Sequence, residues 1–211
     1  MSTTPGTARH ATVPTPLGPF TALVDADGAV LASGWTDDVA LLVPLVHPAL
    51  RPDAPVAADD LGEVTAAVTA FHDGDPGPAA ATPVRQRGGE FLALVWDRMR
   101  EIEAGAPLTY SELAERAGRP AAVRAAAAAC ARNAAALFVP CHRVLRRGGG
   151  LGGFRWGTPL KASLLTLERD AAAARARGGE EDATVPDAAD TADAAAASAA
   201  DGPLPVAAAV S

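Results

Sequence analysis

The alternation of apolar and polar positions in the first third of the chain predicts a small mixed α/β unit. Two apolar runs, 20–24 and 30–33, flank a polar insert that ends in Gly28, and this order is typical of a β-hairpin. Four apolar residues further on recur at helical spacing and predict an amphipathic helix over 61–71: Leu61, Val64, Val68 and Phe71.

Segments without such a pattern lie on both sides of this unit. Residues 1–15 are polar and rich in threonine and proline, so we expect a flexible arm there. Residues 74–82 are rich in proline, glycine and alanine, which indicates a linker. A small N-terminal α/β domain with its linker is therefore predicted over residues 16–82.

Helical periodicity dominates residues 83–170, where we place a second domain. An apolar face at helical spacing predicts a helix over 90–104. Thr158 and Pro159 provide an N-cap and a first-turn proline for a last helix over 158–168.

Between these helices lies the outline of a helix-turn-helix. Thr109 and Glu112 have the spacing of a capping box and begin a short helix. A turn with Gly118 and Pro120 ends that helix, and an alanine-rich helix is predicted over 121–132. Many α-hairpins share this outline, so the pattern alone leaves DNA binding open.

The end of the chain has almost no large apolar residues. Residues 171–211 consist largely of alanine, aspartate and glycine, which predicts a disordered acidic tail. The predicted fold class is thus α+β, with a small N-terminal α/β domain, a helical C-terminal domain and the tail. No apolar run has the length of a membrane span, and no signal peptide is recognised, so we expect a cytoplasmic protein without membrane contact.

Charge is segregated along the chain in a way that its net charge of −7 hides. Residues 1–84 hold two arginines and ten acidic residues, a net charge of −8, and residues 170–211 hold two arginines and eight acidic residues, a net charge of −6. Residues 85–169 hold thirteen arginines, one lysine and seven acidic residues, a net charge of +7. This basic middle favours a polyanion, although a coding bias toward arginine and alanine explains the composition equally well. We expect the acidic tail to weaken DNA binding modestly, because it competes with DNA for this basic middle segment.

The stretch 138–144, Phe-Val-Pro-Cys-His-Arg-Val, holds the most informative chemistry. Cys141 stands beside His142, and an imidazole in a positive field lowers the pKa of a thiol and takes its proton. Pro140 fixes a non-helical backbone there, which suits a presented nucleophile, whereas an inert buried pair is the alternative. Cys130 lies among alanines and is expected to serve packing. Two cysteines without a Cys/His cluster predict neither a disulfide framework nor a metal site.

Together these motifs resemble the O6-alkylguanine-DNA alkyltransferases, most of all the Ada-type C-terminal module. The resemblance covers residues 83–169 strongly and the first eighty residues weakly, and for the latter it implies a ribonuclease H-like fold. It rests on the segments Leu-Thr-Tyr-Ser-Glu-Leu at 108–113, Ala-Val-Arg at 122–124, Pro-Cys-His-Arg-Val at 140–144 and Gly-Gly-Phe-Arg-Trp-Gly at 152–157, and on Asn133, Lys161, Leu164, Leu165 and Glu168.

The resemblance implies irreversible transfer of an alkyl group from O6-alkylguanine, and also from O4-alkylthymine, in DNA to a cysteine. Cys141 is the implied nucleophile, His142 its base through a water, and Glu168 the residue that orients the imidazole. Asn133 is the implied hinge residue that shapes the site. Tyr110 is expected to assist base flipping and to protonate guanine N3. No cofactor and no metal are implied.

The resemblance also implies how DNA is held. Arg124 is expected to fill the base stack after the damaged base leaves, and the small residues after it suit the minor groove. Ser111, Arg119 and Arg147, with Tyr110, occupy DNA-contacting positions and are expected to touch phosphates. The implied partner is double-stranded DNA with an O6-alkylguanine, bound by a monomer.

Three features depart from the family pattern. Phe154 stands where the family usually has tyrosine, Arg132 is an extra arginine before the hinge, and the loop 146–150 reads Arg-Arg-Gly-Gly-Gly. The main alternative is a non-catalytic alkyltransferase-like protein that binds lesions, but those relatives lack the counterpart of Cys141. A helix-turn-helix regulator leaves Pro-Cys-His-Arg unexplained, and a thiol hydrolase needs an oxyanion site for which the sequence offers no candidate.

Overall fold

The hairpin predicted around Gly28 is part of a four-stranded sheet. Strands β2 (Gly18–Val24) and β3 (Val30–Gly34) pair antiparallel, which confirms the hairpin. Strand β1 (Arg9–Thr15) lies on the other side of β2, and the short β4 (Val56–Ala57) runs parallel to β1. The strand order is therefore β3-β2-β1-β4, with β3 at an edge.

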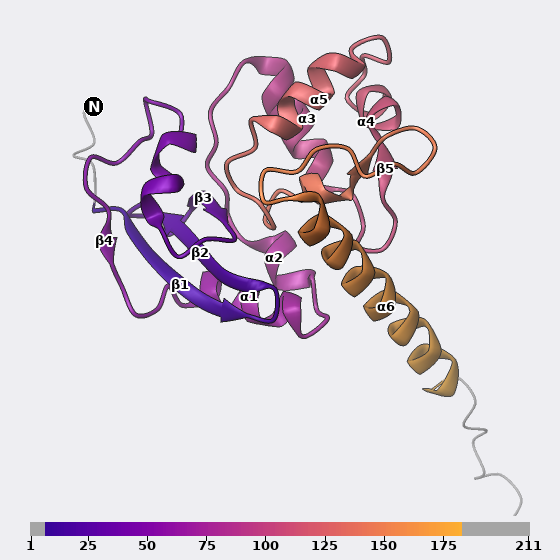
Figure 1. Cartoon of the computed structure of the whole chain (residues 1–211), viewed down its shortest axis with the longest axis horizontal. Coiled ribbons are helices and arrows are strands. Elements are labelled where there is room, and N and C mark those ends of the chain that lie inside the picture. Colours follow the sequence, from indigo (N-terminus) through magenta and orange to yellow (C-terminus); the bar gives the residue numbers. More distant parts are fainter. Residues whose placement is uncertain (1–6, 183–211) are drawn as a thin grey trace, which may run out of the picture. The chain divides into compact units, whose positions relative to one another are not determined.

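The structure is a computed structural model that describes residues 7–182, with side chains up to residue 177 (Figure 1). Up to Ala176 the chain forms one compact unit. Two short 3-10 turns, η1 (Val39–Leu41) and η2 (Val43–Leu45), connect β3 to β4. The architecture is a small sheet with helices, a mixed α/β fold in keeping with the predicted class.

Strand β1 corrects the expectation of a flexible arm for residues 9–15, whereas residues 1–6 lie outside the described part of the chain. Ala11 is buried in the core, and the hydroxyls of Thr12 and Thr21 lie 2.7 Å apart across the strand pair. At the turn, Oγ1 of Thr15 donates to the Gly18 carbonyl at 2.6 Å. Threonine and proline give a weak local signal here, so the pairing with β2 is what makes this segment a strand.

Helix α1 (Glu63–His72) packs against β1 and β2 and confirms the helix predicted over 61–71, with a start two residues later. Three residues of the predicted apolar face are buried on this helix together with Ala67: Val64, Val68 and Phe71. Leu61, the fourth, is also buried but precedes the helix. The predicted linker over 74–82 is not wholly irregular, because it contains the short helix α2 (Gly77–Ala81).

Helices α3 (Glu90–Arg100), α4 (Tyr110–Arg116) and α5 (Val123–Ala131) pack against one another in the second half of the chain (Figure 1). The capping box predicted at the start of α4 is present. The Glu112 N–H donates to Oγ1 of Thr109 at 3.2 Å, and the Thr109 N–H donates to the Glu112 carboxylate at 2.6 Å. Both α3 and α5 are a few residues shorter than predicted.

The last helix, α6 (Thr158–Asp182), corrects the boundary of the predicted tail. We predicted a helix to residue 168 and disorder from residue 171, but the helix continues to Asp182. Alanine and arginine dominate the first residues of this extension and have high helix propensity. In addition, Arg175 donates to the Gly74 carbonyl at 2.6 Å. The rest of the predicted tail, 183–211, lies outside the described residues.

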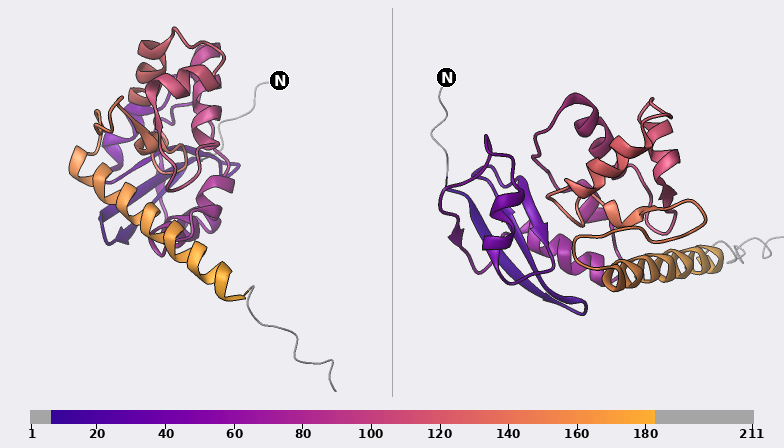
Figure 2. Two further views of the ribbon diagram at one scale, coloured as in Figure 1. Left: turned by 90° about the vertical axis from the view of Figure 1, so that its right-hand side faces the viewer. Right: turned by 45° about the horizontal axis from the view of Figure 1, so that its top comes forward.

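The free edge of β3 joins the two halves of the chain. At its start, Val30 exchanges two backbone hydrogen bonds of 2.9 Å with the segment 83–85. At its end, Ser33 donates its N–H to the Ala134 carbonyl at 2.9 Å and its hydroxyl to the Ala136 carbonyl at 2.8 Å. Figure 2 accordingly shows the violet sheet beside the pink helices. The free edge of β3 thus holds residues 134–136, which directly follow the predicted hinge residue Asn133.

Candidate active site

A short parallel pairing places the predicted nucleophile. Strand β5 (Leu108–Thr109) pairs with β6 (Val144–Leu145), so the turn before β6 lies close to the start of α4. That turn is the 3-10 helix η3 (Cys141–Arg143), and Pro140 precedes it with φ −82° and ψ 67°. Cys141 is half-buried at the start of this turn. The non-helical backbone predicted at Pro140 is therefore present, and a short 3-10 turn follows it and carries the thiol.

Behind Cys141, His142 and Glu168 form a buried pair. Nε2 of His142 lies 2.8 Å from Oε1 of Glu168. The same carboxylate accepts from Nε and Nη2 of Arg143, at 2.9 and 2.7 Å. Burial by itself would raise the pKa of Glu168, but the hydrogen bonds and charges of His142 and Arg143 outweigh it and lower the pKa to about 2. Glu168 is therefore an ionised carboxylate at neutral pH.

The hydrogen bond to Glu168 decides which nitrogen of His142 is free. An ionised carboxylate only accepts hydrogen bonds, so Nε2 carries the proton of the neutral imidazole. Nδ1 is buried and has no hydrogen-bond partner within the described part of the chain. Burial lowers the pKa of His142 despite the opposing attraction of Glu168, so the ring is neutral near pH 7. The site thus contains a base with a free lone pair on Nδ1.

The thiol of Cys141 requires such a base. Burial raises the pKa of Cys141, whereas the side chain of Asn133 and the charges of Lys161 and Arg155 act in the opposite direction. Lys161 is itself buried and donates from Nζ to the Val144 carbonyl at 2.6 Å. The resting group is a protonated thiol, and the thiolate formed from it is stabilised by nearby cationic groups.

Asn133 is held by hydrogen bonds at both ends of its amide. Nδ2 donates to the Val139 carbonyl at 2.7 Å, and Oδ1 accepts from the Ala135 N–H and from Nε2 of Gln86, both at 3.1 Å. Gln86 also accepts from the Ala134 N–H at 2.8 Å. The sequence pointed to Asn133 but missed Gln86, because a glutamine between two arginines belongs to no recognisable motif.

A cavity of about 710 Å³ opens beside Cys141. Tyr110 forms part of its wall from the first turn of α4, and burial raises the pKa of this phenol, so its hydroxyl is a proton donor at neutral pH. Phe154 adds an apolar wall, with its ring centroid 6.5 Å from that of His142. The volume is typical of pockets that bind small molecules.

Three predicted site residues line this cavity: Tyr110, Asn133 and Cys141. His142 and Glu168 do not line it and form a buried pair next to Cys141 in the chain. The four other predicted DNA contacts do not line it. Arg124 is exposed near the start of α5, and Arg147 is exposed in the loop after β6. Ser111 is half-buried in the first turn of α4, and Arg119 is exposed with its guanidinium 5.0 Å from the Phe91 ring centroid.

Sequence reasoning gave no role to three groups that the structure adds to the site. Gln86 supports Asn133, and Arg143 supports Glu168. Arg146 lines the cavity directly. For Arg143, its place in the Pro-Cys-His-Arg motif was a signal that we could have used. For Arg146, the arginine-rich loop was the corresponding signal.

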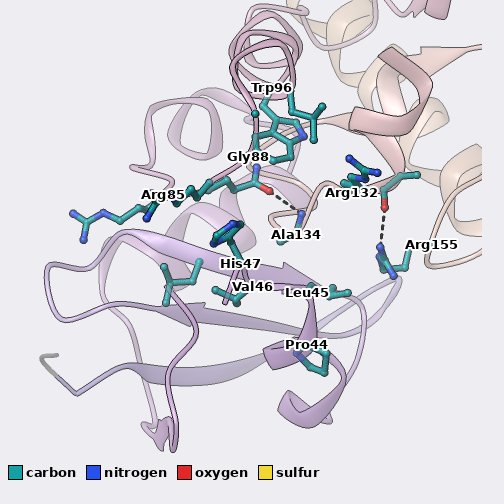
Figure 3. A pocket seen from close by; sticks show the side chains of 16 residues that line it. Pro44, Leu45, Val46, His47, Arg85, Gly88, Trp96, Arg132, Ala134 and Arg155 are labelled. Carbon is teal, nitrogen blue, oxygen red and sulfur yellow. Dashed lines mark hydrogen bonds between the residues drawn. The ribbon is translucent and has the colours of Figure 1, made fainter. Parts of the chain in front are cut away.

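A second cavity, of about 480 Å³, lies beside the segment around Ala134 (Figure 3). Arg155 and Ala131 line both cavities, and Nη2 of Arg155 donates to the Ala131 carbonyl at 2.8 Å, so this hydrogen bond belongs to the wall between them. Cys141 lines the larger cavity and not this one. The titratable side chains of the second lining are all of basic residue types: His47, Arg85, Arg87, Arg132 and Arg155.

Two further properties concern metals and membranes. Among residues 7–182, no group of three or more side chains is arranged to hold a metal ion. Within the same range, no helix combines the length and the apolar character needed to cross a membrane.

Known proteins resemble this chain over different lengths. The family described as 6-O-methylguanine DNA methyltransferase, DNA binding domain, matches residues 90–170. The methylated-DNA–protein-cysteine methyltransferase of Shigella flexneri is 31% identical over 158 residues, which are 74% of this chain and 92% of that protein. The bifunctional transcriptional activator/DNA repair enzyme Ada of Escherichia coli is 47% identical over 88 residues, which are 42% of this chain.

The matched part of the chain spans 25% of the length of Ada and 43% of the length of the Kluyveromyces lactis methyltransferase. Among solved structures, the O6-methylguanine methyltransferase of Mycobacterium tuberculosis superposes with a TM-score of 0.63 at 25% identity, over 78% of this chain and 94% of that one. Because the likeness to the Shigella flexneri protein extends over nearly all of that protein, the chain belongs to the methylated-DNA–protein-cysteine methyltransferase family.

Proposed function

We propose that this protein repairs DNA by transferring the alkyl group of an O6-alkylguanine to Cys141. One observation carries the proposal: the thiol lies at the wall of a cavity, and the next residue in the chain is a neutral histidine with an unpartnered, buried Nδ1. The other nitrogen of His142 is fixed by the Glu168 carboxylate. A nucleophile, a base and a group that orients the base form the arrangement that activates weak nucleophiles.

In the proposed reaction, His142 takes the thiol proton through a water molecule, and the sulfur attacks the alkyl carbon. The C–S bond forms as the bond between that carbon and guanine O6 breaks, and the electron pair remains on the guanine. Tyr110 protonates guanine N3 and regains a proton from the imidazolium through solvent. The products are unmodified guanine and a thioether on Cys141. A thioether resists hydrolysis, so each chain reacts once, and O4-alkylthymine is a second substrate by the same steps.

DNA is proposed to bind through α4 and α5, acting as a helix-turn-helix in the minor groove. A thiol cannot reach O6 inside a duplex, so the base is flipped into the cavity beside Cys141. Arg124 is exposed at the start of α5, where it can enter the vacated stack, and the alanines after it present a narrow face. Ser111, Arg119 and Arg147 are proposed to contact phosphates, which gives affinity without sequence preference.

The resemblance to the alkyltransferases also supports proposals for the N-terminal fold, the domain boundary and the oligomeric state. The N-terminal half is assigned a ribonuclease H-like fold, and the boundary between the two domains is placed after residue 82. The protein is proposed to act as a monomer in the cytoplasm and without a cofactor. Its partner is double-stranded DNA with an alkylated base.

The test is the intact mass of the protein after incubation with duplex DNA containing O6-methylguanine. We expect a gain of one CH₂, about 14 Da, that saturates at one per chain and maps to Cys141. The same duplex with unmodified guanine is the control and leaves the mass unchanged. A chain that binds the lesion duplex selectively but gains no mass contradicts transfer and supports the lesion-binding alternative.

A further inference from the structure

The indole of Trp156 lies directly against the backbone of Gly34, the last residue of β3. A Cβ on Gly34 would lie 2.7 Å from Nε1 of Trp156 and would overlap the ring carbons Cε2 and Cζ2. Gly34 does not have a positive φ, so its backbone conformation is open to other residues. Space for the indole is therefore what requires glycine at this position.

Trp156 also forms part of the wall of the cavity beside Cys141, together with Phe154 and Arg155. Gly34 itself does not line that cavity. Trp156 therefore contacts β3 at Gly34 and also lines the space beside Cys141.

Strand β3 is held on both of its edges near Gly34. Gly34 pairs with Thr21 of β2 on one side. On the other side, the buried Ser33 donates to the carbonyls of Ala134 and Ala136, at 2.9 and 2.8 Å. Moving the strand would break these bonds in the interior, where an unpaired polar group is costly. A larger residue at position 34 therefore displaces the indole rather than the strand.

We propose that Gly34 is a positioning residue that determines specificity: it seats Trp156 against the N-terminal sheet and so leaves room in the pocket for alkyl groups larger than methyl. This inference rests on the proposed function. A methyl group added at position 34 pushes the indole toward Cys141 and narrows the pocket. O6-methylguanine still fits, whereas a longer alkyl chain meets the displaced ring.

The test is the ratio of two single-turnover rate constants, one for duplex DNA with O6-n-propylguanine and one for O6-methylguanine, both followed by intact mass. Gly34→Ala is expected to lower this ratio about tenfold, because misfit by one methylene in an apolar pocket changes rates by that order. Transfer of methyl changes by less than about threefold. Trp156→Ala raises the ratio, and the double variant has the ratio of Trp156→Ala alone, because the ring that would be displaced is gone.

Gly89→Ala is the matched control, because a Cβ at Gly89 meets no atom within 4 Å and the residue has no positive φ. It should leave the ratio unchanged. The proposal is overturned if Gly34→Ala slows both substrates equally, or if it lowers the ratio to the same degree when Trp156 is already replaced. If Gly34→Ala does not fold, the ratio of the two rate constants is measured for Trp156→Ala alone. A ratio equal to that of wild type then overturns the proposal. A wild-type chain that gains no mass from O6-methylguanine overturns the proposed function instead.

Discussion

The two cysteines of the chain line the same cavity from different elements and in different surroundings. Cys130 lies near the end of α5, where its sulfur is 3.6 Å from Sδ of Met99. Cys141 begins the 3-10 turn η3 and has His142 as its neighbour. Burial raises the pKa of both thiols, so acidity alone does not distinguish them.

The neighbours of the two sulfurs, rather than their own pKa values, make the difference. Next to Cys141 in the chain is a neutral imidazole that is held by an ionised carboxylate, and the anchored Asn133 lines the same cavity. The sulfur of Cys130 instead rests on a methionine, in a helix whose neighbouring residues are alanines. A buried thiol becomes a nucleophile only where a base can take its proton, so reactivity is assigned to Cys141.

The largest expected effect comes from replacing each cysteine in turn. Cys141→Ala should abolish alkyl transfer, whereas Cys130→Ala should keep the rate within about threefold, because only the first removes the attacking sulfur. Cys130→Ala should cost about 1 kcal/mol of folding free energy through lost packing on Met99. Intact mass after reaction with methylated duplex and chemical unfolding measure the two quantities. Transfer that survives in Cys141→Ala and is lost in Cys130→Ala would reverse the assignment.

The next largest effect concerns Glu168, which has no counterpart at Cys130. Glu168→Gln should slow transfer about a hundredfold, because an amide does not stabilise the imidazolium that forms when His142 takes the proton. It should also destabilise the fold by about 3 kcal/mol, since Arg143 loses its buried partner. Single-turnover rates and denaturant unfolding at pH 7 separate the two effects. An unchanged rate in a destabilised variant would leave Glu168 a purely structural role.

Because Glu168 is titratable, its contribution to the free energy of unfolding depends on pH. The pKa of Glu168 is lowered in the folded protein from 4.5 to about 2, so its stabilising contribution is complete above pH 4.5 and is lost as the pH falls toward 2. Glu168→Gln lacks the titrating group. The difference in unfolding free energy between wild type and Glu168→Gln should therefore shrink over this acidic range, and a constant difference would be inconsistent with the lowered pKa.

The smallest expected effect comes from Gln86, which supports the cavity from outside any motif. Gln86→Ala removes the hydrogen bonds to Asn133 and to the Ala134 N–H, at a cost of about 1 kcal/mol each. A loosened Asn133 should slow transfer severalfold without abolishing it. Arg87→Ala is the neighbouring control, since Arg87 is exposed and should leave the single-turnover rate as in wild type. Equal rates in both variants would show that the anchoring of Asn133 by Gln86 is dispensable.

Local signals in the sequence found the elements that short-range interactions specify. The hairpin around Gly28, the apolar face of α1 and the capping box of Thr109 and Glu112 all rest on residues a few positions apart, and all are confirmed. Strand β1 and the extension of α6 were missed. In β1, prolines weaken the strand preference of the threonines, and pairing with β2 decides the structure. In the extension of α6, the acidic, alanine-rich composition predicted disorder although alanine has high helix propensity, and Arg175 also bonds to the distant Gly74.

The sequence by itself determined the chemical groups of the site, because Cys141 and His142 are adjacent and the surrounding motifs are specific. Only the tertiary structure decided how these groups are placed relative to one another. It brings Glu168 to Nε2 of His142, anchors Asn133 through Gln86, and sets Trp156 against Gly34. Each of these contacts joins residues more than twenty positions apart, and such contacts depend on how whole elements pack, which no local pattern of side chains encodes.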